Sequence, residues 1–497
     1  INGPAAVIWA MYLAMAKQRG ISWDTLGGTL QNDILKEFHS QNEFIYPPEA
    51  SVKLVVDTIE FQSRMVPRWN SVSISGYHIR EAGSTAVQEL AFTLRDGMEY
   101  VEACVERGLE IDSFAPRLSF FFNSHNEFFE EICKLRAARR IWARMLRDRY
   151  GAPSERSWFM KTHVQTAGCS LTEQQPLNNI VRVAYQAMAG VLGGCQSLHT
   201  DSMDETLGLP TEQAVTVALR TQQILAYETG VTRTTDPLGG SWFIENLTDT
   251  MEREALDLIA EIDGMGRYEE RHEGTGARRE ARHEGTGARR HGGKAGSQGT
   301  NSAGAHASGA HAAGAHPAYA PTAGYGRGVV SGINKGYFRR QIAEASYRFS
   351  EECEAGDRLI VGVNAFRDEN EERSIEILQI DHGVETEQCR RLAEFKRRRD
   401  SKGVAGALER IRRTCREGDP GGGTDLQAGG GAAGDAVGGT GPHAGASAFP
   451  ESARALGLDP RNVMPALING ALAGCTLGEM VQAMADVYGR YTGGPEW

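Results

Sequence analysis

A tyrosine and a histidine stand side by side at Tyr77 and His78, where a short β-prone run, Ser71–Tyr77, ends. A histidine can hydrogen-bond to a carbonyl oxygen or protonate it, which is the chemistry of a general acid. A single histidine after a strand is nevertheless more often a satisfied polar residue than a catalytic one. The meaning of this pair therefore depends on which other polar residues the fold brings to the same place.

Short β-prone runs alternate with long amphipathic stretches over residues 1–265. The stretches from Val87 to Val105 and from Phe128 to Met145 carry apolar residues at helical spacing. Such alternation predicts crossover helices, and therefore a parallel sheet. The predicted strands are Gly28–Gln31, Ser71–Tyr77, Arg117–Phe121, Met160–Gln165 and Cys195–His199.

Polar residues stand near the C-terminal ends of these predicted strands. Two kinds of α/β fold satisfy the alternation of strands and helices. They are an open doubly wound sheet and a (β/α)8 barrel. A barrel gathers all strand ends into one ring, where its active sites lie, whereas an open sheet concentrates them at one switch point. The spread of polar residues over successive strands favours the barrel. These residues are Gln31, Tyr77, His78, Ser119, His163, Gln165, Gln196 and Ser197.

Composition narrows the class of protein. The formal charge of −11 argues against a general nucleic-acid binder, which would carry a basic surface. The eight cysteines lie far apart with no C-x-x-C pair, which is typical of reduced thiols in a cytoplasmic protein. The longest apolar run, Ala5 to Ala16, is too short to span a bilayer. We therefore expect neither a nucleic-acid nor a membrane partner.

Two tracts interrupt the pattern. The sequence RHEGTGARR occurs twice, at Arg271–Arg279 and Arg282–Arg290, within a Gly/Ala/His-rich tract with few large apolar residues. Such composition predicts disorder. The expected organisation is a barrel over residues 1–266, a disordered insertion over 267–328, a linker region over 329–417, a Gly/Ala tract over 418–447 and a helical segment over 448–497. Within the last three we expect a strand-like run Leu359–Phe366, a charged helical segment over Glu385–Arg413, and helices Asn462–Ala473 and Leu477–Tyr488.

Several long runs resemble, in order, the motifs of the methylmalonyl-CoA mutase family. The resemblance covers residues 1–265, about 336–400 and 455–490. It implies an adenosylcobalamin-dependent isomerase that moves a thioester group between neighbouring carbons of an acyl-CoA by radical chemistry. The runs are TLQNDILKEF (Thr29–Phe38), SVSISGYHIREAGSTA (Ser71–Ala86), FAPRLSFFF (Phe114–Phe122), KLRAARRIWARM (Lys134–Met145), HVQTAGCSLT (His163–Thr172), QSLHTDSMDETLGLPT (Gln196–Thr211) and DPLGGSWFIE (Asp236–Glu245).

The resemblance also implies a fold and a partner. It aligns Gln31, Tyr77 and the later strand ends with strands four to eight of the family's (β/α)8 barrel, so the first two barrel strands are expected to be absent from this chain. Family members that bind cobalamin unaided carry a D-x-H-x-x-G motif; Asp381-His382-Gly383 has the wrong spacing. The chain is therefore similar to the large subunit of the family's split form, whose cobalamin-binding domain lies on a separate small subunit, and a hetero-oligomer is expected.

The resemblance assigns roles by position. His78 would hydrogen-bond the migrating thioester carbonyl, and Tyr77 would lie between the substrate and the corrin ring. Asp201 stands where many methylmalonyl-specific members have Asn, and no residue is expected to ligate a metal. The other substrate-binding candidates are Thr29, Gln31, Gln41, Arg117, Ser119, Phe121, His163, Gln165, Gln196 and Ser197, and the cofactor-binding candidates are Glu81, Glu205 and Asp201.

The residue type at position 41 indicates the class of substrate. In methylmalonyl-specific members this position, six residues before the first proline of the IYPP run, is an arginine that holds the free carboxylate. Glutamine is neutral and cannot form that bidentate pair, and leaving a buried carboxylate unpaired costs roughly 3–5 kcal/mol. We therefore expect a monocarboxylic branched substrate, such as isobutyryl-, 2-hydroxyisobutyryl- or pivalyl-CoA.

Three alternatives stay open. The alignment could slip by one residue, which would make Gln41 an ordinary surface residue. The substrate could be methylmalonyl-CoA itself. From a different class, the chain could be an inactive paralogue that serves as an assembly or cofactor-loading partner, although the intact Tyr77-His78 pair argues against this.

Overall fold

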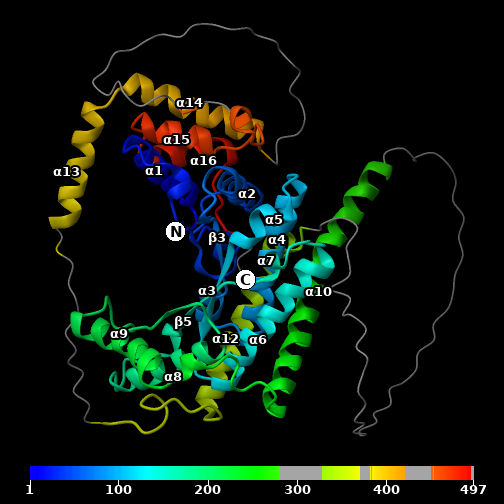
Figure 1. The fold of residues 1–497 in the computed structure, drawn as a ribbon, viewed down its shortest axis with the longest axis vertical. Helices are drawn as coiled ribbons and strands as arrows, with labels where there is room; N and C mark the ends of the chain where they lie inside the picture. The colour runs from blue at the N-terminus through cyan, green and yellow to red at the C-terminus, as the bar shows by residue number, and fades with distance from the viewer. Residues whose placement is uncertain (280–326, 370–380, 382, 420–448, 451–452, 494–497) are drawn as a thin grey trace, which may run out of the picture.

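The computed structural model describes residues 1–279, 327–369, 381, 383–419, 449–450 and 453–493. Short parallel strands lie at its centre and helices surround them (Figure 1). The strand predictions are confirmed to within a few residues, with one further two-residue strand before the second predicted one. The strands are β1 Gly28–Thr29, β2 Trp69–Asn70, β3 Val72–Ser75, β4 Leu118–Ser124, β5 Thr162–Thr166 and β6 Ser197–His199.

All strand pairs are parallel, as predicted. β3, β4, β5 and β6 form one sheet in that order, and β1 pairs with β2. Two hydrogen bonds continue the ladder, from Leu30 N to Asn70 O at 3.0 Å and from Ser73 N to Gln31 O at 2.8 Å. Spatial order therefore follows chain order, and the described strands contain none of the order reversals that mark the switch point of a doubly wound sheet.

Long helices bury one face of this sheet. Helix α4, Ala86–Glu106, begins with a capping box between Thr85 and Gln88, which satisfies its first free N–H groups. Its apolar stripe is buried in the main core with α6, Phe128–Arg144, and α10, Trp242–Arg279. Both helices predicted from apolar spacing are therefore confirmed. The other helices of residues 1–227 are α1 Ala5–Gln18, α2 Pro48–Met65, α3 Tyr77–Glu81, α5 Ile111–Phe114, α7 Glu155–Trp158, α8 Asn178–Leu192 and α9 Glu212–Tyr227.

A second core joins the two ends of the chain. Helices α14, α15 and α16 pack with α1 around Trp9, Leu13 and Met480 (Figure 1). Helices α15 and α16 match the predicted closing helices. The later helices are α11 Gly328–Asn334, α12 Tyr337–Ala355, α13 Gly383–Arg398, α14 Ser401–Glu417, α15 Met464–Leu472 and α16 Leu477–Tyr488. Short 3₁₀ turns span Trp23–Thr25, Ala115–Arg117, Gly168–Ser170, Val231–Arg233 and Ala453–Leu456, and π-helical turns span Glu37–Gln41 and Met145–Arg149.

One expectation for the linker region was wrong and one was confirmed. The run Leu359–Phe366 is a turn, with one bridge between Val361 and Ala365, because Gly362 has φ +86° and the Asn364 side chain accepts a hydrogen bond from Ile360 N. The charged helical segment expected over Glu385–Arg413 is confirmed. It consists of two helices, the first ending at Arg398 and the second capped by Asp400, whose side chain accepts a hydrogen bond from Lys402 N.

The two predicted low-complexity tracts lie mostly outside the described residues. α10 continues to Arg279, past the boundary expected at residue 266, and α11 begins at Gly328. Residues 280–326 and 420–448 are not described. Among the described helices, none is long and apolar enough to cross a membrane. All eight cysteines lie in described segments and are unpaired.

Candidate active site

One face of the sheet carries an aligned row of predicted site residues. Phe121 is opposite His163, and His163 is opposite Ser197, because β4, β5 and β6 run parallel in that register. Residues opposite one another in a sheet project to the same face. The His163 Nδ1 atom lies 2.7 Å from Ser197 Oγ, and the rings of Phe121 and His163 are 4.9 Å apart. The register thus brings three candidates from three strands together.

Tyr77 and His78 lie on α3, which follows β3 immediately. The Tyr77 ring stacks on Phe121 at 4.8 Å, and the His78 ring meets Phe121 edge-on at 5.7 Å. The strand-to-helix corner requires Gly76, because a Cβ there would come within 2.3 Å of Thr93 Oγ1. The local sequence therefore fixes both side chains above the row formed by Phe121, His163 and Ser197.

A hydrogen-bond network orients the Tyr77 hydroxyl. Gln165 Nε2 donates to Tyr77 Oη at 2.8 Å and to Asp201 Oδ1 at 2.7 Å. Asp201 is buried and also accepts from Thr166 Oγ1 at 2.7 Å. Because Tyr77 accepts from Gln165, its own O–H is left to donate elsewhere. Asp201 thus positions Gln165, and its role as a cofactor contact stays a prediction.

Two carboxylates flank Tyr77. Glu81 Oε1 accepts from Asn123 Nδ2 at 2.6 Å, and Glu81 Oε2 accepts from Cys169 N at 2.7 Å. A Cβ on Gly168 would lie 3.2 Å from Glu81 Oε2, 3.5 Å from Tyr77 Oη and 3.6 Å from Glu205 Cγ. A side chain at residue 168 would therefore contact all three of these residues, and the glycine avoids this. Glu205 itself is exposed.

Burial sets the protonation states at this site. It lowers the pKa of His78 to about 3, assisted by the positive charge of Lys36, so the imidazole is neutral near pH 7. Its Nδ1 atom is buried with no hydrogen-bond partner among the described residues. Burial also raises the pKa of Tyr77, with Glu81, Asp201 and Glu205 adding to the effect. A neutral imidazole and a protonated phenol both suit hydrogen-bond donation to a substrate rather than proton exchange.

Glu81 makes folding stability depend on pH. Burial raises its pKa to about 7 in the folded protein, against about 4.3 in an unfolded chain. Between these values the folded state holds a proton that the unfolded state lacks, so the contribution of Glu81 to stability is present below pH 4.3 and is lost as pH rises to 7. We expect Glu81→Gln to be more stable than wild type by about 1–3 kcal/mol at pH 8, with the difference vanishing near pH 4.

Urea denaturation midpoints of the two proteins between pH 4 and 8 measure this effect. Glu127→Gln, which removes an exposed carboxylate at the start of α6, is the control and should show no such divergence. A constant difference between Glu81→Gln and wild type across this range would show that Glu81 is ionised throughout.

The segment after β1 places Gln41 beside a buried ion pair. Lys36 Nζ donates to Gln41 Oε1 at 2.5 Å and lies 2.8 Å from Glu37 Oε1. The Lys36 and Glu37 side chains are fully buried, whereas Gln41 is exposed. Asn2 Nδ2 links this pair to Gln31, donating to Glu37 Oε1 at 2.5 Å and to Gln31 Oε1 at 2.8 Å. Gln31 and Gln41 therefore belong to one polar network.

The remaining candidates lie on the rim of the site or support it. Ser119 is two residues before Phe121 on β4, and its Oγ donates to Val72 O at 3.1 Å. Arg117 is half-buried at the start of β4. Gln196 is exposed, and its Oε1 accepts from Thr162 N at 2.5 Å. Thr29 is exposed on β1, and its Oγ1 atom accepts a hydrogen bond from Asn70 Nδ2 at 3.1 Å.

Several contributing residues were not predicted. Asn123 and Thr166 hydrogen-bond to Glu81 and Asp201. Both stand on observed strands, one or two residues past the predicted strand ends at Phe121 and Gln165. Asn123 faces the same side of the sheet as Phe121, whereas Thr166 faces the opposite side from its neighbour Gln165. Lys36 and Glu37 were missed as well. Their signal in the sequence was a charged pair inside the apolar run Ile34-Leu35-Lys36-Glu37-Phe38.

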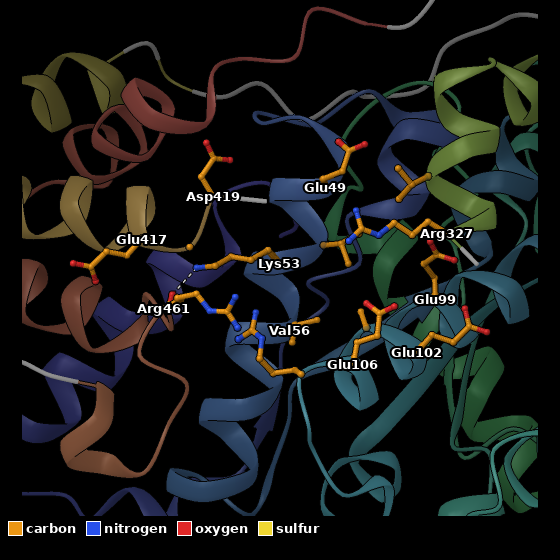
Figure 2. Close-up of a pocket in the computed structure, with 15 residues that line it drawn as sticks. Glu49, Lys53, Val56, Glu99, Glu102, Glu106, Arg327, Glu417, Asp419 and Arg461 are labelled. Carbon is orange, nitrogen blue, oxygen red and sulfur yellow. Dashed lines mark hydrogen bonds between the residues drawn. The ribbon is translucent and has the colours of Figure 1, made fainter. Parts of the chain in front are cut away.

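A separate cavity of about 290 Å³ lies between α2, α4 and the segments that contain Arg327, Glu417 and Arg461 (Figure 2). Its lining is charged, and Lys53 Nζ donates to Arg461 O at 2.7 Å across it. None of the predicted site residues lines this cavity. The candidate active site is therefore the strand-end face that carries Tyr77 and His78.

Comparisons with known proteins identify the family of the chain. A family model described as methylmalonyl-CoA mutase matches residues 1–282 and 323–490. The chain belongs to the methylmalonyl-CoA mutase family. The two matched segments contain every strand and every candidate site residue described above, and the resemblance seen in the sequence motifs is confirmed.

The similar proteins in this family are named for two different substrates. A methylmalonyl-CoA mutase of Rhizobium meliloti (strain 1021) is 37% identical over 497 residues, covering 100% of this chain and 55% of the relative. A 2-hydroxyisobutanoyl-CoA mutase large subunit of Aquincola tertiaricarbonis is 32% identical over 491 residues, covering 99% of this chain and 69% of the relative. The mitochondrial methylmalonyl-CoA mutase of Homo sapiens is 33% identical, with 52% of its length covered. The chain thus spans about half the length of these methylmalonyl-CoA mutases.

Proposed function

We propose that this chain is the substrate-binding part of an adenosylcobalamin-dependent acyl-CoA mutase, an isomerase that rearranges a branched monocarboxylic acyl-CoA. The observation that carries the proposal is the placement of His78 and Tyr77 on Phe121 at the strand-end face, with the neutral His78 ring holding an unpartnered Nδ1 atom. A neutral imidazole N–H can bind the thioester carbonyl and stabilise negative charge that develops on it. Conversion of isobutyryl-CoA by the complete enzyme is the test.

The residues around Gly168 fit the adenosyl group of the cofactor. Carboxylates accept hydrogen bonds from hydroxyl groups, and the side chains of Glu81 and Glu205 both lie beside Gly168 and Tyr77. The two carboxylates would hold the ribose hydroxyls, and the Tyr77 ring would cover the substrate. When bound, the cofactor supplies the radical that starts the rearrangement. The chain's own task is to hold the acyl group still and exclude water from it.

Gln41 supports the choice of a monocarboxylic substrate. Its side-chain oxygen faces Lys36, since an ammonium can only donate, so the amide NH₂ is the group left to meet a ligand. A neutral amide can bind a hydroxyl or a water but leaves a buried carboxylate without a cation. Isobutyryl-, 2-hydroxyisobutyryl- and pivalyl-CoA all satisfy this chemistry.

Methylmalonyl-CoA is the second candidate. Relatives named methylmalonyl-CoA mutase reach 37% identity to this chain, whereas the named 2-hydroxyisobutanoyl-CoA mutase large subunit reaches 32%. Overall identity reports on the whole fold, whereas the acyl pocket is set by a few side chains. For this reason we give Gln41 the greater weight.

The finer proposal for the fold is a (β/α)8 barrel. Successive strands are neighbours, and β6 has a partner on one side only among the described strands. On the helices next to that open edge, large apolar side chains such as Tyr185 and Leu219 are at least half exposed. A further parallel strand and helix would pair with β6 and cover these residues, as closure of a barrel requires.

A separate cobalamin-binding subunit is part of the proposal. We expect the purified chain alone to bind adenosylcobalamin weakly, because its sequence carries no D-x-H-x-x-G motif to ligate the cobalt. Spectroscopic titration of cobalamin, with and without the small subunit of the 2-hydroxyisobutanoyl-type enzymes, measures this. Tight one-to-one binding by the chain alone would contradict the two-subunit arrangement.

A further inference from the structure

The candidate specificity residue Gln41 lies in a turn with an uncommon backbone conformation. Glu37–Gln41 forms one turn of π-helix, closed by a hydrogen bond from Asn42 N to Glu37 O at 2.9 Å. Asn42 ends the turn in the left-handed region, with φ +64°. π-helical turns are rare, and a left-handed residue other than glycine is unfavourable, so both persist only where the surrounding structure holds them.

Two hydrogen bonds from Arg339 hold this turn. Its Nε atom donates to Phe38 O at 3.0 Å, and its Nη2 atom donates to Asn42 Oδ1 at 2.5 Å. Phe38 O is free to accept from Arg339, because Glu43 N, which would bond to it if the π-helix continued, donates to Glu37 Oε2 at 3.0 Å. Arg339 therefore ties the middle of the turn to the residue that ends it.

Arg339 belongs to α12, which lies after the strands and their helices in the sequence. This helix is anchored against the same turn, because the buried Phe338 ring stacks on His39 with 3.9 Å between the ring centroids. Arg339 itself is half-buried, and it forms no ion pair with any carboxylate that the structure describes. Its guanidinium is thus committed to the turn and not to a salt bridge.

Loosening this turn would move Gln41. A π-helical turn holds one residue more than an α-helical turn, so a change to α-helical closure would shift residue 41 by one position, about 100° around the helix axis. Gln41 Oε1 would then lose the hydrogen bond that it accepts from Lys36 Nζ at 2.5 Å. The place of the Gln41 amide therefore depends on the contacts that keep the turn π-helical.

We propose that Arg339 is a positioning residue for acyl-CoA binding, because it holds the π-helical turn in the conformation that presents the Gln41 amide to the acyl group. A helix outside the sheet thereby controls affinity for the substrate without touching it. The inference rests on the proposed function, since it assumes that Gln41 contacts the acyl group. It predicts that Arg339 acts through Gln41 and loses its effect when the Gln41 side chain is removed.

The test is a double-mutant cycle of Arg339→Met and Gln41→Ala in the complete enzyme with the proposed cobalamin-binding subunit. Methionine keeps much of the length of the arginine stem but donates no hydrogen bond. We expect Arg339→Met to raise KM for isobutyryl-CoA by about 5–10-fold, the effect of one hydrogen bond, with a smaller change in kcat. In the Gln41→Ala background the same substitution should change KM by less than about twofold.

Three further variants separate positioning from general damage to the fold. Arg339→Lys retains a donor and should give a KM between those of wild type and Arg339→Met. Arg348→Met removes an exposed arginine further along α12 and should leave KM at its wild-type value. Asn42→Gly suits the left-handed backbone but removes the Oδ1 acceptor, so it should raise KM even if Arg339→Met folds poorly.

Hydrogen–deuterium exchange over residues 37–44 reports on the turn without requiring turnover. Exchange there should be faster in Arg339→Met than in wild type, and unchanged in Arg348→Met. Wild-type exchange in Arg339→Met, or an equal rise in KM with and without the Gln41 side chain, would overturn the positioning role and leave the mutase proposal standing. Wild-type enzyme that turns over neither isobutyryl-CoA nor methylmalonyl-CoA would overturn both.

Discussion

Replacing His78 with alanine is expected to lower kcat by about 10²–10³-fold in the complete enzyme. The His78 imidazole lies edge-on to Phe121 and is held neutral by burial, which lowers its pKa to about 3. A neutral N–H donor binds the thioester carbonyl more strongly as negative charge develops there, so its loss affects the rearrangement more than substrate binding. Steady-state kinetics on the preferred acyl-CoA should therefore show a large change in kcat and a small one in KM.

The control for this variant is His125→Ala. His125 is another histidine whose pKa burial lowers to about 3, but it lies beside a different cavity with Arg80 and Arg358. It should keep near-wild-type turnover. Because the pKa of His78 is far below 7, kcat of wild type should also show no ionisation attributable to His78 between pH 5 and 9. Unchanged turnover in His78→Ala would remove this residue from the mechanism.

Gln41→Arg is expected to weaken the preference for isobutyryl-CoA over methylmalonyl-CoA. Pairing a buried carboxylate with a cation is worth up to two or three orders of magnitude in affinity, from roughly 3–5 kcal/mol. The full change is not expected, because the new guanidinium would stand beside Lys36, and one carboxylate, Glu37, would serve two cations. We expect the ratio of kcat/KM values to shift by about 10–100-fold.

Ser40→Arg is the matched control for this prediction. It adds the same charge to the same π-helical turn, but Ser40 lines a different cavity with His39 and Arg339. Its ratio of kcat/KM values should remain that of wild type. An equal shift in both variants would mean that general electrostatic attraction, and not a contact at residue 41, controls the preference.

The sequence predicted the central strands and helices well because their signals are local. The stripe from Val87 to Val105 became α4, and the β-prone runs became parallel strands within a few residues of their predicted ends. The run Leu359–Phe366 shows where this fails. Its apolar residues resemble a strand, but Gly362 adopts a left-handed conformation and Asn364 hydrogen-bonds locally, so the chain turns.

The sequence predicted the parts of the candidate site that lie at strand ends. It did not predict the side-chain contacts that depend on how separate segments pack. Phe121, His163 and Ser197 each stand on a predicted strand, and parallel pairing is enough to align them. The contact between Lys36 and Gln41 needs a π-helical turn, which no periodicity in the sequence indicates. The effect of Asp201 on Gln165 likewise appears only once β5 and β6 are paired.

The central claim is that this family member acts on a branched monocarboxylic acyl-CoA. The most direct measurement compares kcat/KM for isobutyryl-CoA and methylmalonyl-CoA, using the complete enzyme with the proposed cobalamin-binding subunit and adenosylcobalamin. The neutral Gln41 amide predicts a preference for isobutyryl-CoA of at least about 100-fold. A preference for methylmalonyl-CoA would contradict this assignment of the substrate, and turnover of neither would contradict the catalytic function.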